Sequence, residues 1–194
     1  PYRVCQDLTI PPGGIVLVEP GVLVNFDMGR QLVVAGTLRI EATAYARAIL
    51  TAPGSFPPSI IVQGGAIEAR FAEFHQVLQV GSGANLLLSD CIFSTGSVFL
   101  SDDIPRPPPF IELDRCIFSK AQLALSGCIV VVRDSTFNNT HASLLRSFPD
   151  ITAGNTFTSH PLQIDRQESI QPLFIDGIHA TGSPTAGLSL RGGT

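Results

Sequence analysis

A pattern of alternating apolar and polar positions recurs along much of the chain, and each copy is centred on a phenylalanine. The intervals between successive anchors are 19, 25, 19 and 20 residues, for Phe74, Phe93, Phe118, Phe137 and Phe157. Apolar side chains stand seven and five residues before most anchors and again five and seven residues after them. A short repeat built from period-two segments is typical of a β-solenoid, in which each repeat forms one coil.

Two polar corners interrupt each repeat, and they fix the number of strands per coil. Side chains alternate along a strand, so the change of parity between the positions at −5 and −2 requires a bend between them. The bend falls on Ser89-Asp90, Asp114-Arg115, Arg133-Asp134 and Ala153-Gly154, and a second corner follows each anchor. The pattern predicts an all-β, right-handed parallel β-helix with three strands per coil and roughly eight coils. The phenylalanines should form one interior column.

The chain is expected to be one domain over residues 1–194, with N-terminal coils at 1–66 and the Phe-anchored repeats at 67–194. Pro-Gly corners at 11–14 and 19–21 separate the short apolar runs of the first coils. Residues 101–109 form an insertion that explains the 25-residue interval. Because an uncovered terminal coil leaves a sheet edge that invites aggregation, we expect the chain to be a segment of a larger protein.

Three stretches of the N-terminal region contain recognisable sequence motifs: LTIPPGGIVLVEPGVLVNF at 8–26, LVVAGTLRIEAT at 32–43 and ARAILTAP at 46–53. They resemble the opening of right-handed parallel β-helix domains of the pectin-lyase-like fold, in bark beetle-type cell-junction proteins and bacterial surface proteins. Ala48 and Leu50 depart from the usual Pro and Phe, and Thr43 lacks the usual preceding Gly. The resemblance implies this fold but no single activity, because the superfamily mixes lyases, hydrolases, adhesins and structural domains.

Composition excludes two classes of partner. The net charge is −4, Lys120 is the one lysine, and the remaining basic residues are scattered arginines, so the basic stripe of a nucleic-acid-binding protein is missing. Apolar runs such as 15–18 are too short to span a bilayer, so no membrane insertion is expected.

Candidate catalytic residues are confined to the corners. A polysaccharide lyase or glycoside hydrolase needs clustered carboxylates, with a basic residue or a second carboxylate beside them. Stacked about 4.8 Å apart, the corner residues form columns of alternating sign, which favours surface ion-pair ladders worth about 0–1 kcal/mol per pair. The first column holds Asp90, Arg115 and Asp134, and the next holds Asp114 and Arg133.

Other candidates concern binding and modification. Asp102, Asp103 and Arg106 on the proline-rich insertion are candidates for partner recognition. His141 and His160 could approach each other on adjacent coils, but no third ligand has a fixed spacing, so no metal or cofactor is expected.

Small residues occupy the inward position two before each anchor. Cys91 and Cys116 fall there on consecutive repeats, as either a buried stack of small side chains or a disulfide of uncommon geometry. Asn155 in the same column could join a ladder of hydrogen-bonding side chains. Asn138 begins an N-glycosylation sequon and should point outward.

These observations favour a non-catalytic extracellular structural or adhesion module. It would be a rigid scaffold contacting other domains, subunits or glycans of a larger assembly through its outer sheets, terminal coils and insertion loop. Two alternatives remain open: a polysaccharide lyase or hydrolase of the pectin-lyase-like superfamily, and a trimeric tailspike-like receptor-binding protein.

Overall fold

The computed structural model describes residues 1–52, 59–95, 97–100, 107–145, 147–151, 154–160, 162–165, 174–175, 179–181 and 188–191. These residues form a parallel β-solenoid of about seven turns, near the expected number, and contain no helix. The predicted parallel β-helix is confirmed, and the structure is consistent with right-handed winding. No helix in this part of the chain is long and apolar enough to cross a membrane.

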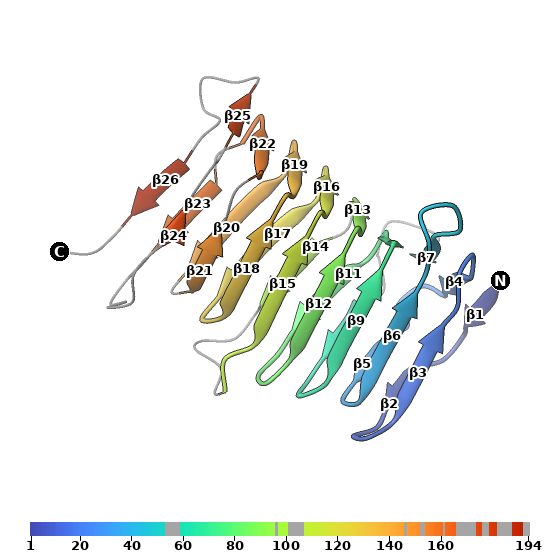
Figure 1. The fold of residues 1–194 in the computed structure, drawn as a ribbon. Coiled ribbons are helices and arrows are strands. Elements are labelled where there is room, and N and C mark those ends of the chain that lie inside the picture. Colours follow the sequence, from blue (N-terminus) through green and yellow to red (C-terminus); the bar gives the residue numbers. More distant parts are fainter. Residues whose placement is uncertain are drawn as a thin grey trace.

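Each coil contributes one strand to each of three parallel sheets, and the coils stack from the N-terminal end to the C-terminal end (Figure 1). Sheet A comprises β1 (Tyr2–Val4), β4 (Leu23–Phe26), β7 (Ala48–Thr51), β10 (Ala72–Phe74), β13 (Ile92–Ser94), β16 (Ile117–Ser119), β19 (Thr136–Asn138), β22 (Thr156–Thr158) and β25 (His179–Thr181). Sheet B comprises β2 (Leu8–Ile10), β5 (Leu32–Val34), β8 (Ser59–Val62), β11 (Val77–Val80), β14 (Ser97–Leu100), β17 (Gln122–Ser126), β20 (His141–Leu145), β23 (Leu162–Asp165) and β26 (Leu188–Arg191). Sheet C comprises β3 (Ile15–Val18), β6 (Thr37–Glu41), β9 (Ala66–Arg70), β12 (Asn85–Ser89), β15 (Phe110–Asp114), β18 (Ile129–Arg133), β21 (Phe148–Ile151) and β24 (Phe174–Ile175).

The phenylalanine anchors form the predicted interior column in sheet A. Neighbouring rings are stacked with centroids 4.5–5.0 Å apart and planes within 12° of parallel. The residues are Phe74, Phe93, Phe118, Phe137 and Phe157, each at most 1% exposed. The in-register pairing of their strands aligns every inward position of one coil with the same position of the next, so the whole core is a set of such columns.

The corner from sheet C to sheet A contains a left-handed residue in every Phe-anchored coil. Phe71, Asp90, Arg115, Asp134 and Gly154 all stand three before an anchor, with φ between 46° and 86°. This single residue makes the predicted bend and reverses the parity of the strand. Asp and Gly suit the position because they accept positive φ more readily than other residues. The main-chain N–H groups of Phe71, Asp90 and Arg115 donate to carbonyls of the next coil at 2.9–3.1 Å.

A polar ladder runs inside the same corner. The Cys116 N–H donates to Ser135 Oγ at 3.0 Å, and the Ser135 N–H donates to Asn155 Oδ1 at 2.9 Å. Asn155 Nδ2 donates in turn to the carbonyl of Val132 at 3.0 Å. The ladder foreseen at Asn155 is therefore present, and its side chains satisfy buried main-chain groups of the preceding coil.

Candidate functional site

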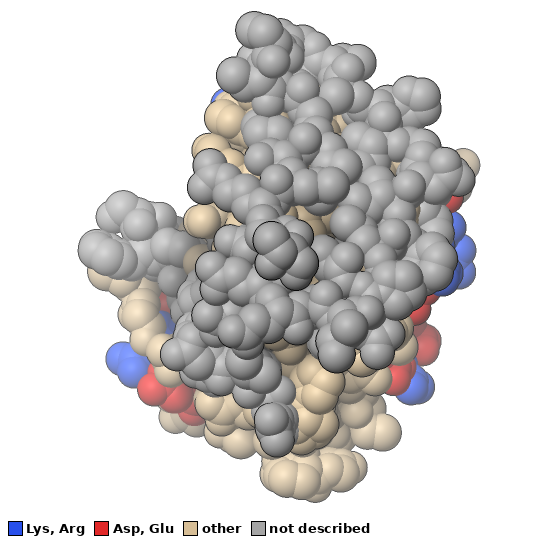
Figure 2. Space-filling model, turned by 90° about the vertical axis from the view of Figure 1, so that its left-hand side faces the viewer, with Lys and Arg blue, Asp and Glu red and all other residues tan. Residues whose placement is uncertain are grey.

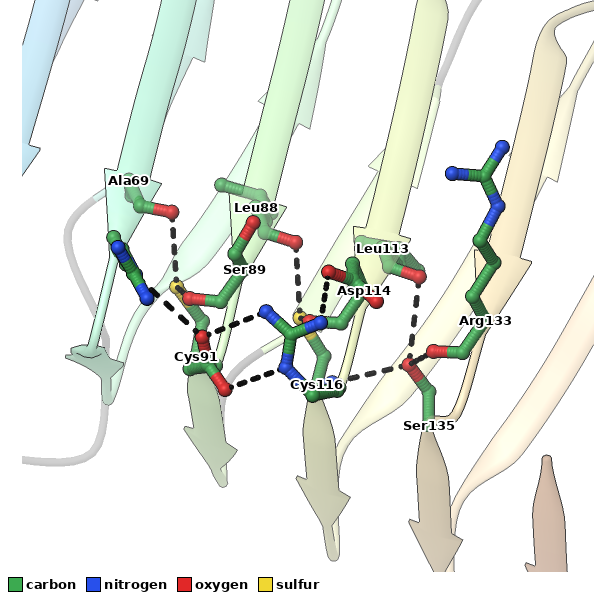
Figure 3. Close-up of polar contacts among 12 residues, drawn as sticks. Ala69, Leu88, Ser89, Cys91, Leu113, Asp114, Cys116, Arg133 and Ser135 are labelled. Carbon is green, nitrogen blue, oxygen red and sulfur yellow. Dashed lines mark hydrogen bonds and ion pairs between the residues drawn. The ribbon is translucent and has the colours of Figure 1, made fainter. Parts of the chain in front are cut away.

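The corner between sheets C and A holds the predicted charged columns. Arg115 Nε and Nη2 donate to the two carboxylate oxygens of Asp90 at 2.9 and 3.0 Å. Arg115 Nη1 lies 2.5 Å from Asp114 Oδ2, so one guanidinium joins two carboxylates. Asp114 lies beside the row of Cys91, Cys116 and Ser135 (Figure 3). Asp90 and Asp114 thus belong to an ion-pair ladder, as the alternating charges predicted, whereas no ion pair among the described residues includes Asp134 of the first column.

One expected pair of this ladder is replaced by another. Asp114 and Arg133 are register neighbours on β15 and β18, but Arg133 Nη1 contacts Glu112 Oε1 at 3.1 Å instead. Asp114 is already held by Arg115, so the Arg133 side chain pairs with the outward carboxylate two residues before Asp114. Arg and Lys groups also lie beside Asp and Glu groups at both margins of the view from the C-terminal end (Figure 2).

The environment of Asp90 favours its charged form. Hydrogen bonds from Arg115 hold the pKa of Asp90 below its ordinary value, partial burial opposes this, and the charges of Arg115, Arg70 and Arg47 add to the lowering. A general acid needs a pKa raised toward the working pH. The pKa of Asp90 is shifted in the opposite direction, so this carboxylate suits the role of a structural counter-ion.

A second cluster beside the first was not predicted. Phe71 lies at the corner, with the guanidinium of Arg47 5.6 Å and that of Arg70 5.1 Å from its ring centroid. Arg47 Nη1 donates to the carbonyl of Asp90 at 2.8 Å, and Arg70 Nε lies 3.7 Å from Asp90 Oδ2. The sequence did contain a signal: the position three before Phe74 is an aromatic residue where later coils have Asp, Arg, Asp and Gly.

Two histidine clusters lie on outer faces. His75 Nε2 is 2.8 Å from Glu73 Oε1 and 3.4 Å from Ser94 Oγ, while Ser94 Oγ donates to the same carboxylate at 3.1 Å. A serine nucleophile relay needs the hydroxyl and the acid at opposite ring nitrogens, and here both face one nitrogen. His141 and His160 stack with ring centroids 4.1 Å apart, which confirms their expected approach.

The two stacked cysteines are buried free thiols in the structure. The Cys91 thiol donates to the carbonyls of Ala69 and Ser89, and the Cys116 thiol to those of Leu88 and Asp114, at 3.3–3.6 Å (Figure 3). Contact with the Cys91 side chain, and then burial, raise the pKa of Cys116 well above its ordinary value. Their disulfide stays a prediction.

The remaining predicted sites have different outcomes. Asn138 is exposed at the end of β19, as the sequon required, and its Oδ1 accepts a hydrogen bond from Thr158 Oγ1 at 2.9 Å. Its glycosylation stays a prediction. The recognition candidates Asp102, Asp103 and Arg106 lie outside the described residues. Within the described ranges, no group of three or more His, Cys, Asp and Glu residues is placed to hold a metal ion.

Two concave regions lie near the N-terminal coils. A shallow groove of about 470 Å³ runs along β6 and β9, lined by Arg39, Glu41, Ala42, Glu68, Arg70 and Leu87 among others. A larger hollow of about 680 Å³ opens at the N-terminal end of the core, between the first strands of the three sheets.

No protein-family model, curated protein or solved structure matches this chain. The resemblance to bark beetle-type and bacterial surface proteins therefore stays a prediction that rests on the motifs of residues 8–53.

Proposed function

We propose that this protein is a non-catalytic extracellular structural or adhesion module. It would serve as a rigid β-helix scaffold whose outer faces contact proteins or glycans within a larger assembly. One observation carries the proposal: the in-register stack, with five parallel phenylalanine rings 4.5–5.0 Å apart, joins successive coils into one continuous core. Such a core favours a stiff rod over a hinged or opening structure.

The state of the corner carboxylates supports the same proposal. Asp90 and Asp114 are bound by Arg115, and Glu112 is bound by Arg133. A lyase or hydrolase would need these groups directed at a substrate and tuned toward proton transfer. An extracellular location is supported by the exposed sequon at Asn138, which lies on the outer face of sheet A.

A turnover assay tests the proposal against its main alternative. The protein would be incubated with pectate, alginate and related acidic polymers, and reducing sugars and unsaturated products would be measured. The proposal predicts no product above a buffer control for the wild type or for an Asp134→Ala variant. Turnover by the wild type that Asp134→Ala abolishes would overturn it in favour of a polysaccharide-cleaving enzyme. Light scattering that gives a trimer mass would instead favour the tailspike-like alternative.

A further inference from the structure

The corner beside Phe71 combines a partly exposed aromatic ring with two arginine side chains that lack a close ion pair within the described part of the chain. Arg47, Arg70 and Arg115 all contact Asp90, which already accepts two hydrogen bonds from Arg115. Among the described residues, Asp90 is the one carboxylate within ion-pair distance of Arg70, at 3.7 Å, and Arg47 has none. The Arg70 side chain is 65% exposed, so its guanidinium is accessible from solvent.

Phe71 stands in a backbone conformation that a bulky residue rarely adopts. Its φ is 54°, and a positive φ at a bulky non-glycine residue is a genuine outlier. The corner imposes this conformation in every Phe-anchored coil, and the later coils place Asp90, Arg115, Asp134 and Gly154 there, so Phe71 is the aromatic exception at this position. The ring is partly buried against the core, and the guanidinium groups of both arginines lie over it.

A short projecting turn lies at the same corner of the preceding coil. The Ala46 N–H donates to Thr43 Oγ1 at 3.1 Å and to the Thr43 carbonyl at 3.2 Å, so the turn is closed by its own hydrogen bonds. Tyr45, at its tip, is fully exposed. Arg47 directly precedes β7, and this strand holds the main chain of Arg47 in place. Tyrosine and arginine on preordered backbone are the residues enriched in protein interfaces.

We propose that Arg47, Arg70 and Phe71, together with the adjoining groove, bind an acidic peptide segment of a protein partner. A partner carboxylate would supply the counter-charge that Asp90 provides only in part, through charge-assisted hydrogen bonds from the two guanidinium groups. Arg70 also lines the groove of about 470 Å³, where Glu41 and Glu68 share Arg39 as their counter-ion and Ala42, Ala69 and Leu87 supply apolar surface. The acid is therefore placed at Arg47 and Arg70, and the apolar part of the lining suits an aliphatic side chain next to it, which a uronic acid polymer lacks.

This inference names the kind of partner for the proposed scaffold, and so it rests on the proposed function. The probe is a synthetic peptide of alternating Glu and Leu, compared with a matched peptide of alternating Gln and Leu and with oligogalacturonate. Binding is followed by calorimetry and by amide chemical shifts at low and moderate salt. We expect saturable binding of the Glu-Leu peptide that weakens with salt, and no saturation with the Gln-Leu peptide.

The variants locate the site. Arg47→Gln/Arg70→Gln should weaken binding of the Glu-Leu peptide by about tenfold or more, because two charge-assisted contacts are lost. Arg133→Gln removes an arginine of the ladder three coils away and should leave binding unchanged. Phe71→Asn replaces the ring by a residue that tolerates positive φ, as Asp90 does in the next coil. This variant should therefore fold but bind more weakly, because the aromatic surface is lost. Far-UV circular dichroism checks that each variant is folded.

Equal binding of the Glu and Gln peptides, or unchanged binding by both site variants, would overturn the inference. Saturable binding of oligogalacturonate in place of the peptide would overturn it in favour of an acidic glycan. The polysaccharide turnover assay reports separately on the proposed function. A protein without turnover that also fails to bind the peptide would retain the scaffold proposal and lose only this site.

Discussion

Replacement of Phe118 by alanine tests the phenylalanine column at its centre. The Phe118 ring has no exposed surface and lies between Phe93, at 4.5 Å, and Phe137, at 4.9 Å. A buried Phe→Ala change costs about 3–5 kcal/mol in unfolding free energy, through lost transfer energy and a residual cavity. Two ring neighbours are lost, each pair worth about 0.5–1.5 kcal/mol beyond its area, so we expect the upper part of that range.

Equilibrium unfolding in urea, followed by far-UV circular dichroism, measures this cost. The slope must match that of the wild type for the midpoints to be compared as free energies, because each coil of a solenoid contacts only its neighbours and can unfold locally. Ile117→Ala is the matched control: the residue precedes Phe118, points outward and is 40% exposed, so it should cost about 1 kcal/mol or less. Phe118→Leu should fall between the two.

A cost below about 1 kcal/mol for Phe118→Ala, or one equal to that of Ile117→Ala, would contradict a stabilising interior column. Either result would mean that the ring is not interior, or that the column contributes little to the stack.

Three further predictions concern the corner and the cysteines. Because the folded-state pKa of Asp90 is lowered, its ion pair should stabilise the protein above the ordinary carboxylate pKa of about 3.9 and lose that contribution as pH falls through the lower folded value. The stability difference between wild type and Asp90→Asn should therefore shrink on acidification, and a constant difference between pH 6 and 2 would contradict this. Asn155→Ala should cost about 1–3 kcal/mol more than the outward Thr156→Ala in urea unfolding, since it removes the partners of two buried main-chain groups. In the folded protein, DTNB should react with the exposed Cys5, because Cys91, Cys116 and Cys128 are buried and burial raises the pKa of Cys128 to about 11. After unfolding, it should react with four thiols. Two thiols after unfolding would show one disulfide instead, and peptide mapping would test whether it joins Cys91 and Cys116.

The sequence predicted the backbone well because its pattern leaves little freedom. A one-residue slip between coils would move Phe93 and Phe118 from the core to solvent, so alternation and repeat length together define one register. The left-handed corner at Asp90 and Asp134 was foreseeable for the same reason, as a change of parity on a polar, turn-forming residue.

Side-chain partners could not be predicted to the same extent. Column positions placed Arg133 next to Asp114, but a long side chain reaches several carboxylates, and the choice of Glu112 depends on Arg115 occupying Asp114 first. Phe71 went unnoticed because its contacts depend on Arg47, which the turn between Thr43 and Ala46 brings to the corner. Neither the length of that turn nor the rotamers of the arginines follow from the repeat.

One distance shows whether the coils form a rigid stack in register. Spin labels on Ile49→Cys and Thr156→Cys, in a Cys5→Ser background, would mark outward positions of one column of sheet A. Five register steps through Glu73, Ile92, Ile117 and Thr136 separate them, or about 24 Å at about 4.8 Å per step. We expect a narrow distance distribution centred near that separation in a pulsed electron–electron double resonance experiment. A broad distribution, or one centred far from it, would contradict the stacked, rigid scaffold.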